Sequence, residues 1–458
     1  MTKAVAIGLL SAALGWMLLN FAGVEARDSN LALALIGLAA CCVGWRARED
    51  NWRAPAVVLP VALLLIAAGQ MVPLPLGLMS HLSPARAELL QALAPVTDAA
   101  SWAPLSNQVS ATWQRWLQLL GCVLTLLVVR TVVRERHLGI WRAAAPLMLM
   151  ALAEAVLGLV QYGMTEGGEV VTGTYANRNH FAGLLAMSLP FLVALAAWRL
   201  RPVEGHRKRR PAVGATVAAC LLLGLAAGIL CATLLSLSRM GFLSALAALG
   251  TTGLLILWAR VEGRRLKGAV VIAAAATVMA GAVFLPTDAL IGRFASIAVR
   301  EDLSKDDRVR IWQDTRQLVA DYGVAGCGLG AYEPTFVRYQ RGSPMQTVNF
   351  AHNDYLQVLA ELGVLGFVLV VGAGLCVSWS AVRNARMAGD SPARYVAMAC
   401  CGSLTAIWLH SLVDFNLYVP ANSMAAAWVL GLAAGSRTEA GPKTAGQESA
   451  TIEDLAST

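Results

Sequence analysis

The sequence contains few charged residues for its length. Only 14% of its 458 residues are Asp, Glu, Lys or Arg, whereas 57% are hydrophobic, and the mean hydropathy is +0.61. A soluble protein of this size could not bury that much apolar surface, so the composition excludes a soluble globular protein. The apolar runs also lack the two-residue alternation of barrel strands, which excludes an outer-membrane barrel. The sequence therefore predicts an all-α integral membrane protein.

The spacing of the cysteines does not indicate a disulfide framework. Of the nine cysteines, eight fall inside apolar runs, where a thiol packs as a small apolar group. Only Cys327 lies in a polar segment outside these runs, so it has no external partner for a disulfide. No spacing of Cys and His resembles a zinc site, and a structural zinc is not expected.

About twelve apolar segments are long enough, or nearly long enough, to cross a bilayer as helices. They are residues 4–22, 31–45, 55–75, 116–133, 143–163, 181–199, 211–237, 240–258, 268–285, 355–380, 395–413 and 422–436. One large external loop is expected at about 286–354. We divide the chain into N-terminal membrane helices at 1–150, a transmembrane core at 151–436 and a disordered cytoplasmic tail at 437–458.

The distribution of basic residues indicates how the spans are oriented. With a cytoplasmic N-terminus, 23 of the 36 Lys and Arg residues lie in cytoplasmic segments and 13 lie outside. Eight of those 13 are in the loop at 286–354, which is long enough to escape the positive-inside rule. Both termini are therefore predicted in the cytoplasm. Orientation and anionic lipid explain the net charge of +8, including the Arg207–Arg210 run, without any nucleic-acid partner.

The large external loop contains a helical pattern. A capping-box-like start at Ser304 and Asp307 precedes an apolar stripe at helical spacing. The stripe consists of Ile311, Thr315, Leu318, Val319 and Tyr322. Gly326, Gly328 and Gly330 then end the helix. We expect an amphipathic helix that lies on the membrane surface, followed by a glycine turn.

A polar motif, Ala351-His352-Asn353-Asp354-Tyr355, stands at the edge of the tenth predicted span, and Glu361 follows it. Polar and ionisable groups at such a position are costly unless they serve chemistry or find partners. Three more polar clusters are predicted on the same side of the membrane: residues 173–180, Ser238-Arg239 and residues 307–312. Two or three arginines with one or two histidines indicate a site for an anionic group and a proton-transfer residue.

Each of these residues also has a structural interpretation. Arg178 and Arg239 can extend to lipid headgroups, and Arg308 and Arg310 can form the solvated face of the loop helix. The histidines can cap or orient loops, and a carboxylate at another external helix end can be a structural partner. These residues are His180, His352 and Asp414.

The four clusters together resemble the O-antigen ligase and polymerase superfamily of membrane glycosyltransferases. Residues 173–182 resemble its Asn-x-Asn-His-Phe-Ala element, and Ser238-Arg239 resembles its Ser-Arg element. Residues 308–312 and 326–330 resemble its Arg-x-x-x-Trp and Gly-x-Gly-x-Gly pattern. Residues 351–366 resemble its His-Asn-x-Tyr-Leu and Glu-Leu-Gly signature. Four elements in the family's order are far more specific than any one of them.

The resemblance implies transfer of a glycan from an undecaprenyl pyrophosphate carrier to an acceptor hydroxyl on the periplasmic face of the bacterial inner membrane. In ligases the acceptor is lipid A–core, and in polymerases it is the end of another lipid-linked glycan. By matching position, His352 is the catalytic histidine, and Arg239 and Arg308 contact the pyrophosphate. Arg178 and Arg310 are further candidates for substrate binding. The supporting residues are Asn177, His180, Asn353, Asp354, Tyr355 and Glu361.

Elementary chemistry agrees with these roles. A glycosyl pyrophosphate is an activated donor, and arginines stabilise the charge that builds on its leaving group. His352 would accept the acceptor proton, a role typically worth about 10²–10⁴-fold in rate. Asn353, Asp354 or Glu361 can fix its tautomer, and the sequence does not choose among them. The external loops contain no DxD pair of carboxylates, so neither a metal nor another cofactor is expected.

A transporter of a polysaccharide precursor or a small solute is the main alternative from another class. Twelve spans with both termini in the cytoplasm are common among carriers, and Glu154 is the clearest ionisable residue within a span. No internal repeat supports this alternative, and the polar residues gather at one face. A structural scaffold would not need such an Arg/His set. Among enzymes, ligase and polymerase stay open, and glycosylation of protein is less favoured because members with that activity tend to carry an extra C-terminal region.

Overall fold

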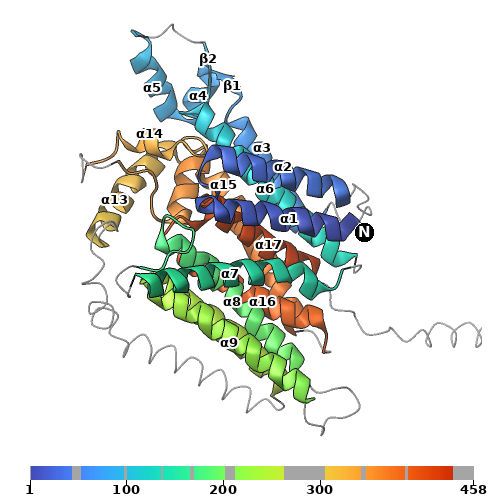
Figure 1. Ribbon diagram of the computed structural model, residues 1–458. Coiled ribbons are helices and arrows are strands. Elements are labelled where there is room, and N and C mark those ends of the chain that lie inside the picture. Colours follow the sequence, from blue (N-terminus) through green and yellow to red (C-terminus); the bar gives the residue numbers. More distant parts are fainter. Residues whose placement is uncertain are drawn as a thin grey trace, which may run out of the picture.

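The computed structural model describes residues 2–43, 53–96, 101–135, 138–165, 170–201, 212–261, 305–341, 347–386 and 390–436. These ranges are almost entirely helical (Figure 1). The bundle helices are α1 (Thr2–Leu19), α2 (Ala26–Val43), α3 (Pro55–Gly69), α6 (Val109–Arg134), α7 (Ile140–Met164), α8 (Arg178–Arg199), α9 (Val213–Leu235), α10 (Arg239–Arg260), α15 (Asp354–Arg386), α16 (Pro392–His410) and α17 (Pro420–Gly435). The shorter elements are η1 (Phe21–Gly23), β1 (Pro73–Pro75), α4 (Leu76–Leu82), α5 (Pro84–Leu93), β2 (Trp102–Pro104), α13 (Lys305–Tyr322), α14 (Tyr332–Phe336) and η3 (Asn416–Tyr418).

Eleven of the twelve predicted spans lie wholly or mostly in the described ranges, and each of these overlaps a helix. The predicted span at 55–75 is too long, because α3 ends at Gly69 and residues 73–75 form β1. The remaining predicted span, 268–285, lies outside the described residues, as do Ser304 of the predicted cap and the tail at 437–458. Eight of the helices are long and apolar enough to cross a membrane: α1, α2, α6, α7, α8, α9, α10 and α15. Helix α3, with 15 residues, is shorter than a usual span. The structure therefore supports an all-α, multi-pass membrane protein.

Helices α8, α16 and α17 form the centre of the bundle. Of the most apolar 18-residue window of each helix, 78% is buried in α8 but only 28% in α9. Small residues let the central helices approach their neighbours closely. A Cβ atom on Gly402 of α16 would lie 2.1 Å from Oγ1 of Thr252 on α10, and one on Gly431 of α17 would lie 2.8 Å from the Leu126 carbonyl on α6. These central helices are therefore packed closely against their neighbours.

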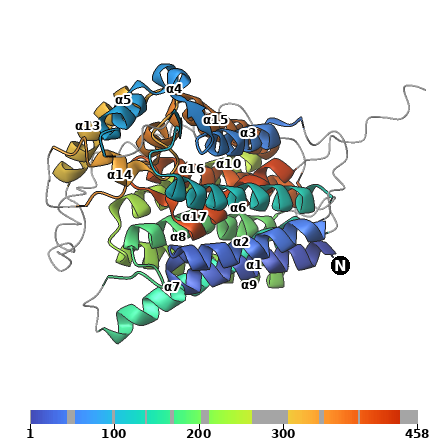
Figure 2. The same ribbon diagram turned by 90° about the horizontal axis from the view of Figure 1, so that it is seen from above.

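One end of the bundle carries the polar connections. Helices α8, α10, α15 and α17 begin there, and α16 ends there. Figure 2 shows the N-terminus of the chain at one end of the bundle and α5, α13 and α14 at the other. The four polar clusters of the sequence belong to this second end, which is the arrangement that alternating spans predict.

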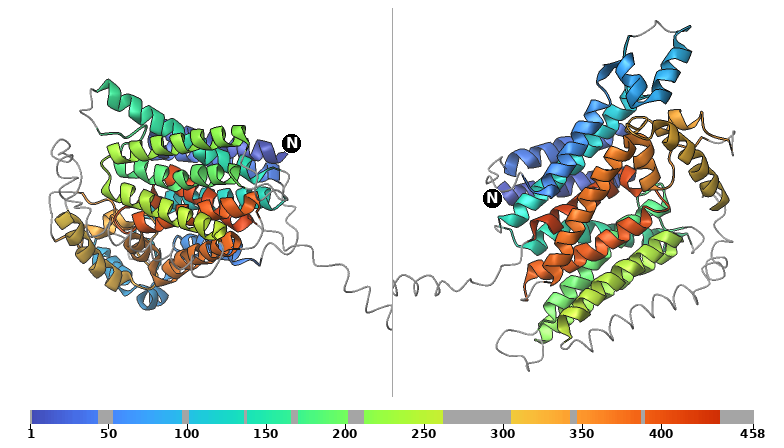
Figure 3. Two further views of the ribbon diagram at one scale, coloured as in Figure 1. Left: turned by 90° about the horizontal axis from the view of Figure 1, so that it is seen from below. Right: turned by 180° about the vertical axis from the view of Figure 1, so that it is seen from behind.

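Segments far apart in the sequence form one unit at this end, which we call the loop unit (residues 73–96, 101–107 and 305–341). Strands β1 and β2 pair antiparallel with Pro73 opposite Pro104, and α5 packs against α13. The views in Figures 1 and 3 show α4 and α5 projecting beyond the bundle near α13. The Asn107 amide donates to the Tyr322 hydroxyl at 3.0 Å and to Thr335 Oγ1 at 2.9 Å. The loop unit is therefore held together by packing and by buried polar contacts.

The apolar stripe of α13 is buried by protein. Ile311 is 6% exposed and Leu318 is 0% exposed. They pack in one cluster with Tyr332 and Phe336 of α14 and with Ala351. The helical spacing predicted for this segment is confirmed. The expectation that its apolar side rests on the membrane is wrong, because α14 and the start of α15 cover that side.

The glycine turn after α13 fits into a break in α15. Gly326 has φ +73°, and a Cβ atom there would lie 2.1 Å from the carbonyl oxygen of Glu361. Gly363 inside α15 has φ +65°, and the Val364 N–H donates to the Gly323 carbonyl at 2.9 Å. Both glycines adopt the left-handed region that other residues avoid. Helix α15 thus consists of a short first piece in contact with the loop unit and a long second piece in the bundle.

Candidate functional site

Three histidines from three helix ends surround one carboxylate. His180 is the third residue of α8, His410 is the last of α16, and His352 lies two residues before α15. Nε2 of His180 is 3.5 Å from Oδ1 of Asp414, and Nδ1 of His352 is 4.0 Å from the same oxygen. Nε2 of His410 is 3.7 Å from the other oxygen, Oδ2. Three of the six histidines in the chain thus share a single acid, and we call these four residues the His/Asp cluster.

The Asp414 carboxylate stays ionised in this cluster. Burial alone would raise the pKa of Asp414, but the neighbouring imidazoles more than offset this effect and lower its pKa below the ordinary value. The backbone N–H of Phe415 also donates to Oδ1 at 2.9 Å. A buried anion beside imidazole rings favours the protonated form of a ring, so the cluster can accept a proton. In the described part of the chain, no group of three or more His, Cys, Asp or Glu side chains is arranged to hold a metal ion.

Aromatic rings cover one side of the cluster. The Phe415 ring meets the His180 ring edge-on with 4.6 Å between centroids, and it meets the His352 ring in the same way at 4.9 Å. Phe350 stacks on Phe415 at 4.1 Å. We call Phe350 and Phe415 the aromatic wall. It limits the directions from which water or a substrate can reach the two imidazoles.

The backbone at His352 is strained. Its φ is +50°, a left-handed value that costs a non-glycine residue about 1–2 kcal/mol. Such residues gather at functional sites, where the surrounding structure holds them in place. Among the described residues only Phe21, Ala22 and Leu237 share this feature, and Leu237 directly precedes Ser238-Arg239. The strain therefore marks two of the four polar clusters found in the sequence.

Arg178 and Arg239 begin neighbouring helices at this end of the bundle. Arg178 is the first residue of α8 and is partly buried, whereas Arg239 is the first residue of α10 and is exposed. The two helices are so close that a Cβ atom on Gly241 would lie 2.3 Å from the Cβ atom of Ala182. Ser238 caps α10 by accepting from the Gly241 N–H at 3.2 Å. The backbones of both arginines thus lie at the same end of the bundle as His180.

The structure brings Arg308 toward the His/Asp cluster but leaves Arg310 apart. Arg308 is partly buried, and its charge acts on His410. Its Nε atom is buried and has no hydrogen-bond partner among the described residues, so its N–H can donate a hydrogen bond to a bound anion. Arg310 is exposed, and its position two residues later puts it on another side of α13. Arg308 is therefore the better candidate for binding an anionic substrate.

Three of the predicted supporting residues act on helix ends. Oδ1 of Asn177 accepts from the Asn179 N–H at 2.8 Å and caps α8. Oδ1 of Asn353 accepts from the Tyr355 N–H at 3.0 Å and caps α15 in the same way. The Tyr355 hydroxyl donates to the Trp408 carbonyl of α16 at 2.8 Å. These contacts explain the polar residues of the two motifs as parts of the framework around the histidines.

The carboxylates of Asp354 and Glu361, which follow His352 in the sequence, accept hydrogen bonds from groups other than the His352 imidazole. Oδ2 of Asp354 accepts from Oγ of Ser411 at 2.7 Å. Glu361 is 0% exposed and accepts from Gln357 Nε2 and from the Tyr418 hydroxyl, both at 2.8 Å. These bonds tie α15 to α16 and to η3. Both residues are therefore explained by the fold.

The carboxylate beside the His352 imidazole is Asp414, which the sequence indicated only as a structural partner. Its signal was the spacing of His410 and Asp414, four residues apart, which places both at the end of one helix. Nothing in the sequence connected that helix end with His352. Sequence reasoning also gave no role to Trp312 or Gln357, which contact the residue before His352.

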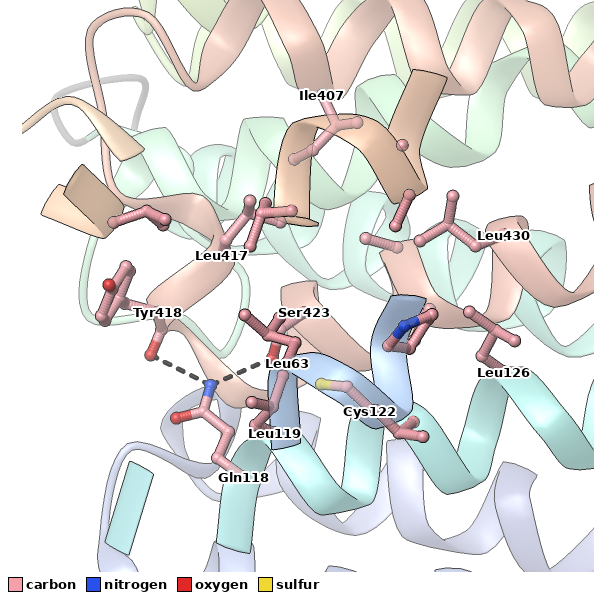
Figure 4. Close-up of a pocket in the computed structure, with 18 of the residues that line it drawn as sticks. Leu63, Gln118, Leu119, Cys122, Leu126, Ile407, Leu417, Tyr418, Ser423 and Leu430 are labelled. Atoms are coloured by element: carbon pink, nitrogen blue, oxygen red, sulfur yellow. Dashed lines mark hydrogen bonds between the residues drawn. The ribbon is translucent and has the colours of Figure 1, made fainter. Parts of the chain in front are cut away.

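An apolar cavity of about 240 Å³ lies beside the cluster, between α3, α6, α15, α16 and α17 (Figure 4). Its labelled apolar lining residues include Leu63, Leu119, Leu126, Ile407 and Leu430. At its polar end, Gln118 Nε2 donates to the Tyr418 carbonyl at 3.3 Å and to Ser423 Oγ at 3.0 Å. Ser411 also lines the cavity and donates to Asp354. The cavity therefore ends at the connection between α16 and η3 that carries Asp414.

Residues 224–371 match the family model described as O-Antigen ligase. The matched range includes Ser238-Arg239, Arg308, the glycine turn and the His352 motif. No curated protein matches the chain. The match supports the O-antigen ligase and polymerase superfamily that the sequence motifs indicated. His180 and Asp414 lie outside the matched range and join the site through the fold alone.

Proposed function

We propose, from the match of residues 224–371 to the O-antigen ligase family and from the geometry beside it, that the protein is a membrane glycosyltransferase. It transfers a glycan from undecaprenyl pyrophosphate to an acceptor hydroxyl on the periplasmic face of the bacterial inner membrane. The observation that carries the proposal is the strained His352 beside Asp414, together with Arg308, which has a buried guanidinium nitrogen and a charge that acts on His410.

His352 acts as the general base. The acceptor oxygen attacks the anomeric carbon of the donor, and the bond from that carbon to the pyrophosphate oxygen breaks. The acceptor proton passes to the His352 imidazole, and undecaprenyl pyrophosphate leaves with the bonding electrons. Because Nδ1 of the ring faces Asp414 at 4.0 Å, the acceptor approaches Nε2 on the other side. The Asp414 charge then stabilises the imidazolium that forms.

The arginines bind the pyrophosphate. A guanidinium keeps its charge when it is partly desolvated and presents several donors to phosphate oxygens. Arg308 is partly buried and close to the histidines, and Arg239 starts α10 at the same end of the bundle. Arg178 on α8 adds a third positive charge, and Arg310 contributes only to the surrounding field. Their charges stabilise the leaving group as it departs.

The apolar cavity holds part of the polyprenyl chain of a lipid-linked substrate. Its lining comes from five helices at bundle depth, and its polar end reaches the connection that carries Asp414. A polyprenyl chain anchored there would keep the attached pyrophosphate near the His/Asp cluster. The cavity is apolar almost throughout, which suits a hydrocarbon chain and not a sugar.

Filling this cavity should weaken binding of long-chain donors. Cys122 lines the cavity, and Cys122→Phe is expected to raise KM for a long-chain donor about tenfold, because displaced isoprene units lose about 0.8 kcal/mol per buried CH₂. The measurement compares KM for a full-length donor and for a donor with two isoprene units. Cys220→Phe is the control, since Cys220 is exposed on α9. An equal KM for the long donor in Cys122→Phe and the parent protein would remove the cavity from the proposal.

Transport is less well supported than glycan transfer. Glu154, the ionisable residue that favoured a carrier, accepts from the Thr174 N–H at 2.9 Å and from the Thr174 hydroxyl at 2.8 Å. It therefore supports the polar loop before α8, which is a structural role. The glycosyltransferase explains the His/Asp cluster, and a carrier does not require it.

Deletion of the gene followed by analysis of the surface polysaccharide tests the proposed function. Loss of a polymerase leaves single-repeat glycan, whereas loss of a ligase leaves full-length glycan on its carrier. Complementation with the parent gene should restore the original pattern in either case. An unchanged polysaccharide together with the loss of uptake of one solute would contradict the proposal and favour a transporter.

A further inference from the structure

Ala351, the residue before His352, is held from two sides. Its backbone N–H donates to Oε1 of Gln357 at 2.6 Å, and its carbonyl accepts from Nε1 of Trp312 at 3.0 Å. Ala351 and Gln357 are both 0% exposed. Both polar groups of this residue are therefore bound by side chains in a buried setting, where losing either bond is costly. We call Trp312 and Gln357 the clamp.

Hydrogen bonds also fix the orientation of the Gln357 amide. Nε2 of Gln357 donates to Oε1 of Glu361 at 2.8 Å, and Oε2 of Glu361 accepts from the Tyr418 hydroxyl at 2.8 Å. A carboxylate oxygen accepts hydrogen bonds, so the Gln357 amide turns its NH₂ group toward Glu361 and its oxygen toward Ala351. This chain explains why a glutamate is buried one turn after Gln357.

We infer that Trp312 and Gln357 are positioning residues that hold His352 in its left-handed conformation. A non-glycine residue leaves that region unless its surroundings over-determine it. The clamp binds the residue before His352. On the other side, Asn353 donates to the Leu412 carbonyl at 2.9 Å, and the Asp354 N–H donates to the Ser411 carbonyl at 2.9 Å. The histidine is thus bracketed by fixed neighbours.

The clamp also connects the two parts of the proposed reaction. Trp312 follows Arg308 by four residues on α13, so both side chains lie on one side of that helix. Arg308 is proposed to bind the pyrophosphate, and Trp312 holds the residue before the proposed base. Donor binding and placement of the base therefore depend on the same helix. This inference rests on the proposed function and adds the residues that position its base.

The test removes one hydrogen bond and keeps the aromatic ring. In Trp312→Phe, kcat for glycan transfer is expected to fall about 10- to 100-fold, because small displacements of a catalytic group have effects of that size. KM for the donor should stay within about twofold of the parent value, since the arginines are unchanged. Trp116→Phe is the matched control. It removes an equivalent bond, from Nε1 to the Leu64 carbonyl at 3.0 Å, which does not involve Ala351, and should leave kcat unchanged.

A second variant separates the hydrogen bond from packing. Replacing Trp312 by 3-benzothienylalanine keeps the shape of the indole and removes only its N–H, so it should lower kcat as Trp312→Phe does. Parent-like kcat in this variant would overturn the inference, and so would a raised KM with unchanged kcat. Measuring the parent protein and His352→Ala in the same assay distinguishes failure of the proposed function or base from failure of the positioning role. If the parent protein transfers no glycan, the proposed function fails. If His352→Ala keeps full activity, the proposed role of His352 as the base fails. If His352→Ala is inactive while the Trp312 variants are unaffected, only the positioning role fails.

Discussion

Replacing His352 by alanine is expected to lower kcat for glycan transfer by about 10²–10⁴-fold, the usual contribution of a general base. The His352 imidazole, which faces Asp414, is the proposed acceptor of the proton, and alanine offers no substitute. Binding of undecaprenyl pyrophosphate should change little, because the arginines remain. Transfer is measured with purified protein in lipid nanodiscs, using a lipid-linked glycan and its acceptor.

His81→Ala is the matched control for this change. His81 is exposed on α4 in the loop unit, away from the His/Asp cluster, and the variant should transfer glycan at the parent rate. A His352→Ala protein that still transfers glycan at the parent rate would show that the base is another group. A loss of carrier binding equal to the loss of rate would assign His352 to binding instead.

Replacing Asp414 by asparagine is expected to lower kcat by roughly 100-fold, because catalytic groups depend strongly on their orientation and local charge. Asparagine has nearly the same shape but lacks the charge that stabilises protonated imidazoles. The carboxylate has a pKa below its ordinary value, so it is ionised throughout the working pH range and does not itself titrate there. The substitution should therefore lower the rate of glycan transfer at every pH at which the parent protein is active.

The pH dependence of the rate distinguishes this role from a structural one. Without the negative charge 4.0 Å from His352, the protonated ring is less stable, and the acidic limb of the pH–rate profile should move to lower pH. Asp390→Asn is the control, since Asp390 is exposed at the opposite end of α16. An Asp414→Asn protein with a reduced rate but an unshifted acidic limb would assign Asp414 to folding alone.

The helices were predictable because each span must satisfy its own backbone hydrogen bonds in the bilayer and must be apolar along its length. Both requirements can be read in one segment at a time, and each of the eleven predicted segments that the structure describes overlaps a helix over most of its length. Which helices lie at the centre depends on their neighbours. Small residues such as Gly402 and Gly431 permit the close approach, but their partners Thr252 and Leu126 are far away in the sequence.

The residues of the candidate site could be proposed from the sequence where a motif stayed within one segment. His352, Arg308 and Arg239 each stand in a short recognisable pattern, and helix alternation brings those patterns to one end of the bundle. Asp414 was not assigned to His352, because the two residues are 62 positions apart and two complete predicted spans lie between them. The position of α13 was wrong for a related reason. An apolar stripe predicts a buried side, but it does not distinguish burial in lipid from burial in protein.

The aromatic wall has a consequence for the fate of the donor. A glycosyl pyrophosphate can lose its glycan to any hydroxyl, and water is by far the most abundant one. Phe415 covers one side of the His180 and His352 rings, with Phe350 stacked behind it, so water has fewer ways to reach the base than an open site would allow. Phe415→Ala should therefore release more free glycan per transfer event, which chromatography of the soluble products would measure. In the proposed reaction, the wall therefore favours transfer to the acceptor over hydrolysis of the donor.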